Sequence, residues 1–255
     1  MTPWWELAAY AVLMLTAGGM RLWDLGSRAL HHDESLHSFY SWQLAEGRGY
    51  AHFPMTHGPF QFEATAAVFF VLGDSDFTSR LLYAVLGTVL VGMPFFLRTR
   101  LGRWGALIVS GLLVFSPAML YFSRFARNDI LMAVWTLGLV ITMWRYLDEG
   151  KSRYLYMASA LLALVFATKE TSYLITVILG GFLALLVFVE VWDGIRRRID
   201  LYGVPLPLAA ARVTGEIWLV LRKGTALPRP SRAGGFLVLL VTLTLPLWSA
   251  AISIF

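Results

Sequence analysis

A short acidic segment flanked by histidines is the first place in the sequence where chemistry could occur. The chain has five histidines, all in one region: His31, His32, His37, His52 and His57. Asp33 and Glu34 lie among them, and three interpretations are open. The pair could cap a helix, whose N-terminal end favours an anion. It could supply a general base with a neighbouring partner. It could also join His31, His32 and His37 in binding a divalent metal, although the spacing is not that of H-E-x-x-H.

A second set of charged residues lies at the ends of apolar stretches: Arg80, Arg124, Arg127, Asp129, Lys169 and Glu170. Charges close to a membrane are costly and therefore indicate function. Arg80 and Arg124 could instead extend to lipid headgroups. Arginine binds a phosphate through two parallel N–H groups and lysine binds it as a point charge. A carboxylate and several cations on one face would therefore suit an anionic lipid phosphate.

The composition indicates a membrane protein that must position these residues with helices. Of 255 residues, 58% are hydrophobic and only 15% are charged. Soluble domains are about 45–50% apolar and about 25% charged. These values exclude a disordered chain, a coiled coil, a nucleic-acid-binding domain and most soluble enzymes. With no cysteine, the chain has no disulfide, thiolate nucleophile or thiolate zinc site.

Seven apolar stretches predict transmembrane helices, some of them marginally, since a span needs about 17–25 residues. They cover about 4–23, 80–97, 104–122, 130–147, 154–168, 173–191 and 234–254. The run 60–72 is shorter, carries Glu63 and follows Gly58-Pro59, so we expect an amphipathic helix at the interface. A second interfacial helix is expected to begin near Asp33, with Leu36, Phe39, Tyr40 and Leu44 on one face. The predicted fold is therefore an all-α polytopic membrane protein with seven transmembrane and two juxtamembrane helices.

Charge in the loops predicts the orientation. The loop 98–103 and the segment 193–233 are basic, whereas the long loop 24–79 is acidic. By the positive-inside rule, the N-terminus and the basic loops are cytoplasmic and the loop 24–79 is external. We expect a catalytic-type membrane module over 1–192, a basic cytoplasmic loop over 193–233 and a last transmembrane helix over 234–255. The chain ends in an apolar segment and is expected to be part of a longer protein.

Several motifs in order resemble the GT-C glycosyltransferases, within them the protein O-mannosyltransferase and aminoarabinose-lipid A transferase group. Over about residues 20–175 the matching segments are His32-Asp33-Glu34, His57-Gly58-Pro59-Phe60, Arg80 to Gly87, Ser116-Pro117 with Ser123 to Asp129, and Thr168-Lys169-Glu170. The seven predicted spans and two juxtamembrane helices also match the family's N-terminal module. Gly58 replaces the first proline of the family's P-P pair, Glu170 replaces a glycine, and the family's C-terminal spans and external domain are missing.

The resemblance implies transfer of a sugar from a polyprenyl-phosphate donor to an acceptor hydroxyl at the external face of the cell membrane, with inversion. Asp33 would be the base, positioned or tuned by Glu34. His57, Arg127 and Lys169 would hold the donor phosphate. Asp129, Arg80 and Glu170 would support this set. The acceptor would be a protein, a lipid or a glycan.

Two other functions are compatible with the same residues: a component that transports or flips lipid-linked sugars, and a non-catalytic subunit with a transferase-like fold. Transport favours charges and broken helices near the bilayer midplane, whereas the charges here lie at the ends of the predicted spans. The donor carries its own phosphate, so the reaction requires no cofactor, and the histidines leave a divalent metal open. No nucleic-acid partner is expected.

Overall fold

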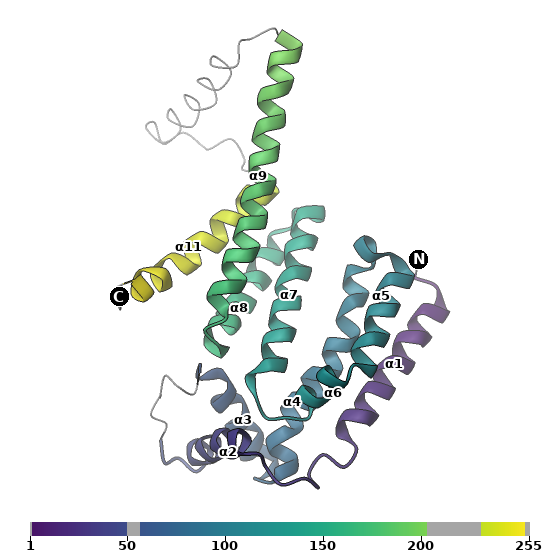
Figure 1. The fold of residues 1–255 in the computed structure, drawn as a ribbon, viewed down its shortest axis with the longest axis vertical. Helices are drawn as coiled ribbons and strands as arrows, with labels where there is room; N and C mark the ends of the chain where they lie inside the picture. The colour runs from purple at the N-terminus through teal and green to yellow at the C-terminus, as the bar shows by residue number, and fades with distance from the viewer. Residues whose placement is uncertain (1, 50–56, 203–230, 253–255) are drawn as a thin grey trace. The chain divides into compact units, whose positions relative to one another are not determined.

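The computed structural model describes residues 2–49, 57–202 and 231–252, and every regular element in these ranges is a helix (Figure 1). The elements are α1 (Trp4–Leu22), α2 (His32–Ala45), α3 (Phe60–Leu72), α4 (Asp76–Gly92), the short 3-10 helix η2 (Met93–Leu97), α5 (Arg98–Phe115), α6 (Pro117–Ser123), α7 (Asn128–Glu149), α8 (Ser152–Thr168), α9 (Ser172–Tyr202) and α11 (Arg232–Ile252). The prediction of an all-α fold is confirmed.

Three helical segments in the described part are long and apolar enough to cross a membrane: Asp76–Phe115, Asn128–Glu149 and Ser172–Asp193. The first contains α4, η2 and α5, and Gly102 interrupts its helical geometry with φ 72°. Shorter apolar helices cover Phe60–Leu72, Ser152–Thr168 and Arg232–Leu247. The chain is thus an integral membrane protein by the length and composition of its helices, and the count of seven spans stays a prediction.

The predicted stretch 104–122 is two helices in the structure. Helix α5 ends at Phe115, Ser116 is extended, and α6 begins at Pro117. The Ser116 hydroxyl accepts a hydrogen bond from the N–H of Met119 and caps α6. Proline at the first position of a helix has no N–H to satisfy, so Ser116-Pro117 ends one helix and begins the next. This break turns the chain toward the segment that carries Arg127.

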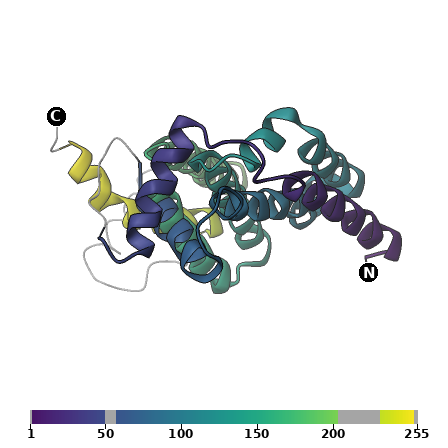
Figure 2. The same ribbon diagram turned by 90° about the horizontal axis from the view of Figure 1, so that it is seen from below.

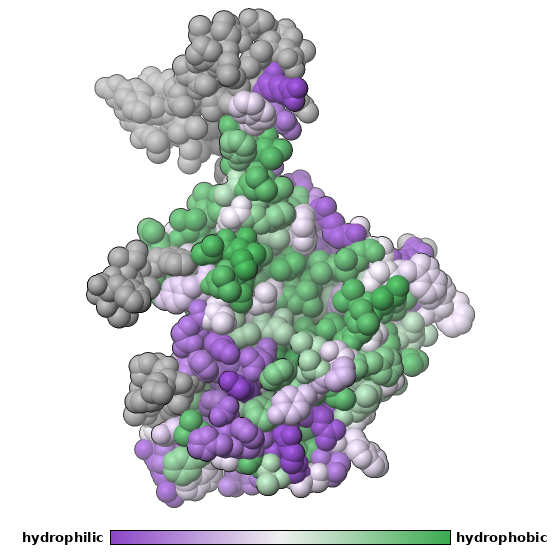
Figure 3. Space-filling model, in the orientation of Figure 1, coloured by the Kyte–Doolittle hydropathy of each residue, from purple (hydrophilic) through white to green (hydrophobic). Residues whose placement is uncertain are grey.

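The chain forms two compact units, the first comprising residues 1–144 and 156–173 and the second 145–155 and 174–255. In the first unit α4 packs against α1, α3 and α6, and α2 packs against α3, as Figures 1 and 2 show. Its core contains Tyr83, Leu90, Ala126, Ile130 and Leu131. Hydrophilic residues gather at the lower end of Figure 3, where Figure 1 places α2. All the predicted site residues belong to this unit.

In the second unit, Glu149 at the end of α7 collects basic and hydroxyl partners. Its carboxylate accepts hydrogen bonds from Lys151 Nζ at 2.6 Å and from Tyr154 Oη at 2.8 Å. Arg232, at the start of α11, donates to the carbonyl oxygens of Leu147 and Asp148. These contacts satisfy carbonyl groups that the end of a helix leaves unpaired.

Helix α2 begins at the acidic pair, as predicted, but the face that it buries is polar. Glu34, His37, Ser38 and Ser41 are buried, whereas Leu36 and Phe39 are 38% and 51% exposed. Glu34 and His37 hydrogen-bond to Arg80 and Ala126, and these contacts hold α2 against the neighbouring segments. Leu36 and Phe39 lie on the outer side of α2, and its position at a membrane interface stays a prediction.

Arginine side chains cap two of the helix ends near the predicted site. Arg124 donates from Nη1 to the carbonyl oxygen of Met20 at 2.8 Å and from Nη2 to that of Asp24 at 3.2 Å. Arg21 is fully buried and donates to the carbonyl oxygen of Leu113 at 3.0 Å. Arg124 therefore binds the end of α1 in the structure, which explains its position without a lipid headgroup.

Gly87 is required where α4 passes the end of α6. A Cβ atom there would lie 2.2 Å from Ser123 Oγ and 2.5 Å from Ser123 Cβ. We expect Gly87→Ala to lower the free energy of unfolding by about 1–3 kcal/mol, the usual cost of overpacking. Denaturant unfolding in detergent micelles measures it. Gly111→Ala in α5 is the matched control, since a Cβ there meets nothing within 4 Å. Equal stability of the two variants would contradict the close packing at Gly87.

Candidate active site

A buried ion pair between Glu34 of α2 and Arg80 of α4 organises the predicted site. Arg80 donates from Nε to Glu34 Oε1 and from Nη2 to Glu34 Oε2, both at 2.8 Å. The side chains are 1% and 0% exposed. Arg80 also donates to the carbonyl oxygens of Leu25 at 3.0 Å and Arg28 at 2.8 Å. Because Arg80 is enclosed in this way, it does not extend to a lipid headgroup.

The remaining acceptor positions of Glu34 bind backbone N–H groups. Oε2 accepts from the N–H of His31 at 3.0 Å, and Oε1 accepts from the N–H of Ala126 at 3.0 Å. Burial alone would raise the pKa of Glu34, but the bonds from Arg80, His31 and Ala126 hold that pKa below its usual value. The carboxylate is thus fully engaged and joins α2, α4 and the segment between α6 and α7.

The carbonyl group of Ala126 is held as firmly as its N–H. It accepts from Gln61 Nε2 of α3 at 3.2 Å and lies 3.3 Å from His37 Nδ1. His37 is 7% exposed. Burial lowers the pKa of His37, which favours the neutral imidazole that donates from Nδ1. Two helices, α2 and α3, therefore fix the peptide that precedes Arg127.

A row of alternating charges lies on the surface above this framework. Arg127 Nη1 is 3.3 Å from Asp33 Oδ2, and Arg127 Nε is 3.6 Å from Asp129 Oδ2. Lys169 Nζ donates to Asp129 Oδ1 at 3.2 Å. Asp33 is 40% exposed and Arg127 is 38% exposed. The structure thus brings together Asp33, Arg127, Asp129 and Lys169 from the start of α2, the start of α7 and the end of α8, which we call the charge row.

His57 and Glu170 are in hydrogen-bonding contact beside this row, with Nδ1 and Oε2 2.8 Å apart. The neighbouring Gly58 donates its N–H to the carbonyl oxygen of Thr168 at 3.2 Å. A Cβ at Gly58 would lie 2.1 Å from the carbonyl oxygen of Ala167. The two departures from the family motifs, Gly58 and Glu170, are therefore adjacent in space. Gly58 lets the two backbone segments approach, and Glu170 binds the side chain of His57, the residue before Gly58.

The described residues contain no group of three or more histidine, cysteine, aspartate or glutamate side chains placed to hold a metal ion. His31 caps α2, where its Nδ1 accepts a hydrogen bond from the N–H of Asp33 at 3.3 Å. His37 is occupied by Ala126. His32 lies on the exposed side of the first turn. These three histidines do not converge, and His52 lies outside the described residues.

Three contributors to the site were not predicted from the sequence: Gln61, Ala126 and Arg28. Gln61 donates to the backbone carbonyl group of Ala126. A contact with the backbone leaves no pattern in the sequence, so neither residue could be predicted. Arg28 lies 3.4 Å from Glu34 and stacks near Tyr121 and Phe125. Its place in an acidic loop was a signal that could have indicated an internal partner.

Removal of the Glu34 charge tests the framework. We expect Glu34→Gln to lower the free energy of unfolding by about 3–5 kcal/mol, because Arg80 would remain buried without its counter-ion. Denaturant unfolding in micelles provides the measurement. Glu63→Gln, on the exposed side of α3, makes the same chemical change and should leave stability unaltered. A small loss for Glu34→Gln would mean that water or another group compensates Arg80.

Acidification tests the burial of His37. Its pKa is lowered in the folded protein, so the unfolded chain takes up the proton first, near the ordinary value of about 6.5. Stability should therefore fall as pH drops below about 6.5, with a limit near 1.4 kcal/mol per pH unit for one group. His37→Asn should flatten the melting temperature between about pH 6.5 and pH 5.5. His32→Asn is the exposed control, and an equal slope in His37→Asn and wild type would contradict the assignment.

Comparison with known proteins identifies the family. The model of the dolichyl-phosphate-mannose-protein mannosyltransferase family matches residues 56–213, more than half of the chain. The match includes His57, Arg80, Arg127, Asp129 and Lys169 but begins after Asp33 and Glu34. Searches of curated proteins and of solved structures gave no match. This match agrees with the apolar helices and with the motifs that the structure brings together. The chain therefore belongs to the dolichyl-phosphate-mannose-protein mannosyltransferase family, whose members are membrane glycosyltransferases of the GT-C type.

Proposed function

We propose that this glycosyltransferase moves a sugar from a polyprenyl-phosphate donor to an acceptor hydroxyl of a protein, lipid or glycan, with Asp33 as the general base. The observation that carries the proposal is the charge row. It places a half-exposed carboxylate within 3.3 Å of a guanidinium that is itself linked to Lys169 through Asp129. A base and a phosphate site must lie this close together if one substrate is deprotonated while the other loses its phosphate.

The cations of the row are suited to the donor phosphate. Arg127 and Lys169 are 38% and 19% exposed, so a ligand can reach both. His57 lies at the same end of α8, since Gly58 is hydrogen-bonded to Thr168. Asp129 bonds both Arg127 and Lys169, and so orients them rather than binding the donor. These two fixed cations, with the His57 imidazole near them, would stabilise the negative charge that develops on the leaving phosphate.

Asp33 has the freedom that a base needs, whereas Glu34 does not. The Asp33 carboxylate is 40% exposed, and its one ion pair among the described residues is to Arg127 at 3.3 Å. Glu34 is fully buried and all its acceptor positions are taken. When a donor phosphate engages Arg127, Asp33 becomes available to the acceptor. Glu34 is then a positioning residue that fixes the first turn of α2.

The reaction balances with these groups alone. The acceptor oxygen attacks the anomeric carbon while Asp33 takes its proton. The bond between that carbon and the phosphate oxygen breaks, and its electron pair stays on the phosphate. Arg127 and Lys169 hold the polyprenyl phosphate that results. One displacement inverts the anomeric configuration, and these cations supply charge that a divalent metal would otherwise provide.

We further propose that the charge row faces the outside of the cell membrane, with the N-terminus in the cytoplasm and seven helices crossing. The basic loops support this orientation by the positive-inside rule. Asp33 and Asp129 lie in the first turns of α2 and α7, and Lys169 directly follows α8. Charges at helix ends favour a transferase over a transporter, which would place them near the bilayer midplane.

The decisive experiment compares wild type with Asp33→Asn in proteoliposomes supplied with polyprenyl-phosphate sugars. Release of free polyprenyl phosphate is followed, and we expect the substitution to lower the rate at least about a hundredfold, in the range for loss of a general base. Asp24→Asn, an exposed carboxylate of the same loop, is the control and should keep the wild-type rate. A parallel reaction with a chelator tests the metal, and activity should persist.

Two results would contradict the proposal. Equal release from wild type and Asp33→Asn would remove Asp33 from the mechanism. Absence of release from folded wild-type protein, across the donors supplied, would favour the non-catalytic subunit.

A further inference from the structure

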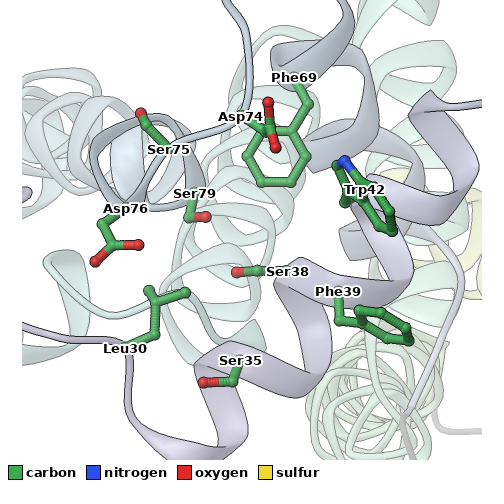
Figure 4. Close-up of a pocket in the computed structure, with 10 residues that line it drawn as sticks. All are labelled: Leu30, Ser35, Ser38, Phe39, Trp42, Phe69, Asp74, Ser75, Asp76 and Ser79. Carbon is green, nitrogen blue, oxygen red and sulfur yellow. The ribbon is translucent and has the colours of Figure 1, made fainter.

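A cleft of about 460 Å³ lies beside α2 (Figure 4). With 3.6 residues per turn, Ser38 and Trp42 lie on the opposite side of the helix from Asp33. The walls come from α2, the end of α3 and the start of α4. The lining residues are Leu30, Ser35, Ser38, Phe39, Trp42, Phe69, Asp74, Ser75, Asp76 and Ser79. The cleft is therefore separate from the charge row.

The lining of the cleft is suited to a cation. It contains two carboxylates, Asp74 and Asp76, and no lysine, arginine or histidine. Within the described residues neither carboxylate has an ion-pair partner within 4.0 Å. Aromatic rings of Phe39, Trp42 and Phe69 supply apolar walls, whose faces also attract ammonium groups. This chemistry excludes a phosphate as the group bound at the base of the cleft.

An unsatisfied hydroxyl group points into the same space. Ser38 is 7% exposed, and its Oγ has no hydrogen-bond partner. Figure 4 shows this hydroxyl directed toward the side of the cleft where Leu30 and Ser79 lie. Ser41, one turn further along the same helix, donates instead to the carbonyl oxygen of His37 at 2.8 Å. A buried hydroxyl without a partner costs free energy, and a ligand that donates a hydrogen bond would remove that cost.

The rim of the cleft carries features that a lipid would use. At the end of α3, Phe70, Val71 and Leu72 are 81%, 74% and 59% exposed, and an exposed apolar segment of this kind indicates contact with a membrane. On the other side, the guanidinium of Arg48 lies 4.5 Å from the centre of the Trp42 ring. Carboxylates in the cleft, a cation at its rim and an apolar segment beside it together match a zwitterionic lipid.

We propose that this cleft binds a membrane lipid whose head carries a primary ammonium and a phosphate. The ammonium contacts the Ser38 hydroxyl and the carboxylates of Asp74 and Asp76. The phosphate lies next to Arg48, and an acyl chain lies along Phe70–Leu72. The inference rests on residues outside the charge row and does not depend on the transfer reaction.

Native mass spectrometry of the purified chain in detergent tests the site. It is titrated with phosphatidylethanolamine and with phosphatidylglycerol of the same acyl chains. Wild type should bind phosphatidylethanolamine at least about tenfold more tightly, as expected for one charge-assisted hydrogen bond. Asp74→Asn combined with Asp76→Asn should abolish this preference, while Glu63→Gln, in the exposed part of α3, should keep it.

Ser38→Ala separates binding from folding. Removal of an unpartnered buried hydroxyl should leave the melting temperature unchanged or raise it, so weaker binding of phosphatidylethanolamine in this variant reports a lost contact. Equal affinity of wild type for the two lipids, or an unchanged preference in the double aspartate variant, would overturn the proposal. Soluble glycerophosphoethanolamine distinguishes the source. If it binds as tightly as the lipid, the ammonium site stands and the acyl-chain contact is wrong.

Discussion

The bidentate ion pair between Glu34 and Arg80 is the interaction on which the rest of the site depends. A buried carboxylate and a buried guanidinium are each costly, and they are tolerated only when every lone pair and N–H group is engaged. Here the surrounding backbone engages nearly all of them. The pair therefore works as a three-way junction that fixes the start of α2, the start of α4 and the segment that precedes α7.

This junction divides the acidic pair into a buried support, Glu34, and an exposed carboxylate, Asp33. Glu34 points inward and is fully occupied, whereas the adjacent Asp33 is 40% exposed and pairs with Arg127 at 3.3 Å. The same division recurs at the next segment, where Ala126 is held on both sides and Arg127 is exposed. The buried residues Glu34 and Ala126 are thus each followed or preceded by an exposed residue of the charge row. The buried hydrogen bonds therefore fix the positions from which Asp33 and Arg127 extend.

The sequence predicted the helical class, a short helix over 60–72 and residues that the structure brings together at the site. These predictions rest on hydrophobic periodicity and on the order of motifs, and both can be read from the sequence without knowledge of tertiary contacts. It did not predict the polar buried face of α2, because Glu34, His37 and Ser41 are satisfied by groups distant in sequence. The break at Ser116-Pro117 and the contact between Gly58 and Thr168 depend likewise on local backbone geometry that hydropathy does not record.

The long sequence separations within the junction impose an order on biogenesis. Glu34 precedes Arg80 by 46 residues and Ala126 by 92 residues. During synthesis its carboxylate is therefore made well before either partner, and it must stay hydrated until α4 and the segment after α6 have followed. Helix α2 can dock only late, so the segment that carries it stays unassembled until α4 and the segment after α6 have been made. Quality control of this protein should accordingly act on a single late event, the closure of the Glu34 junction.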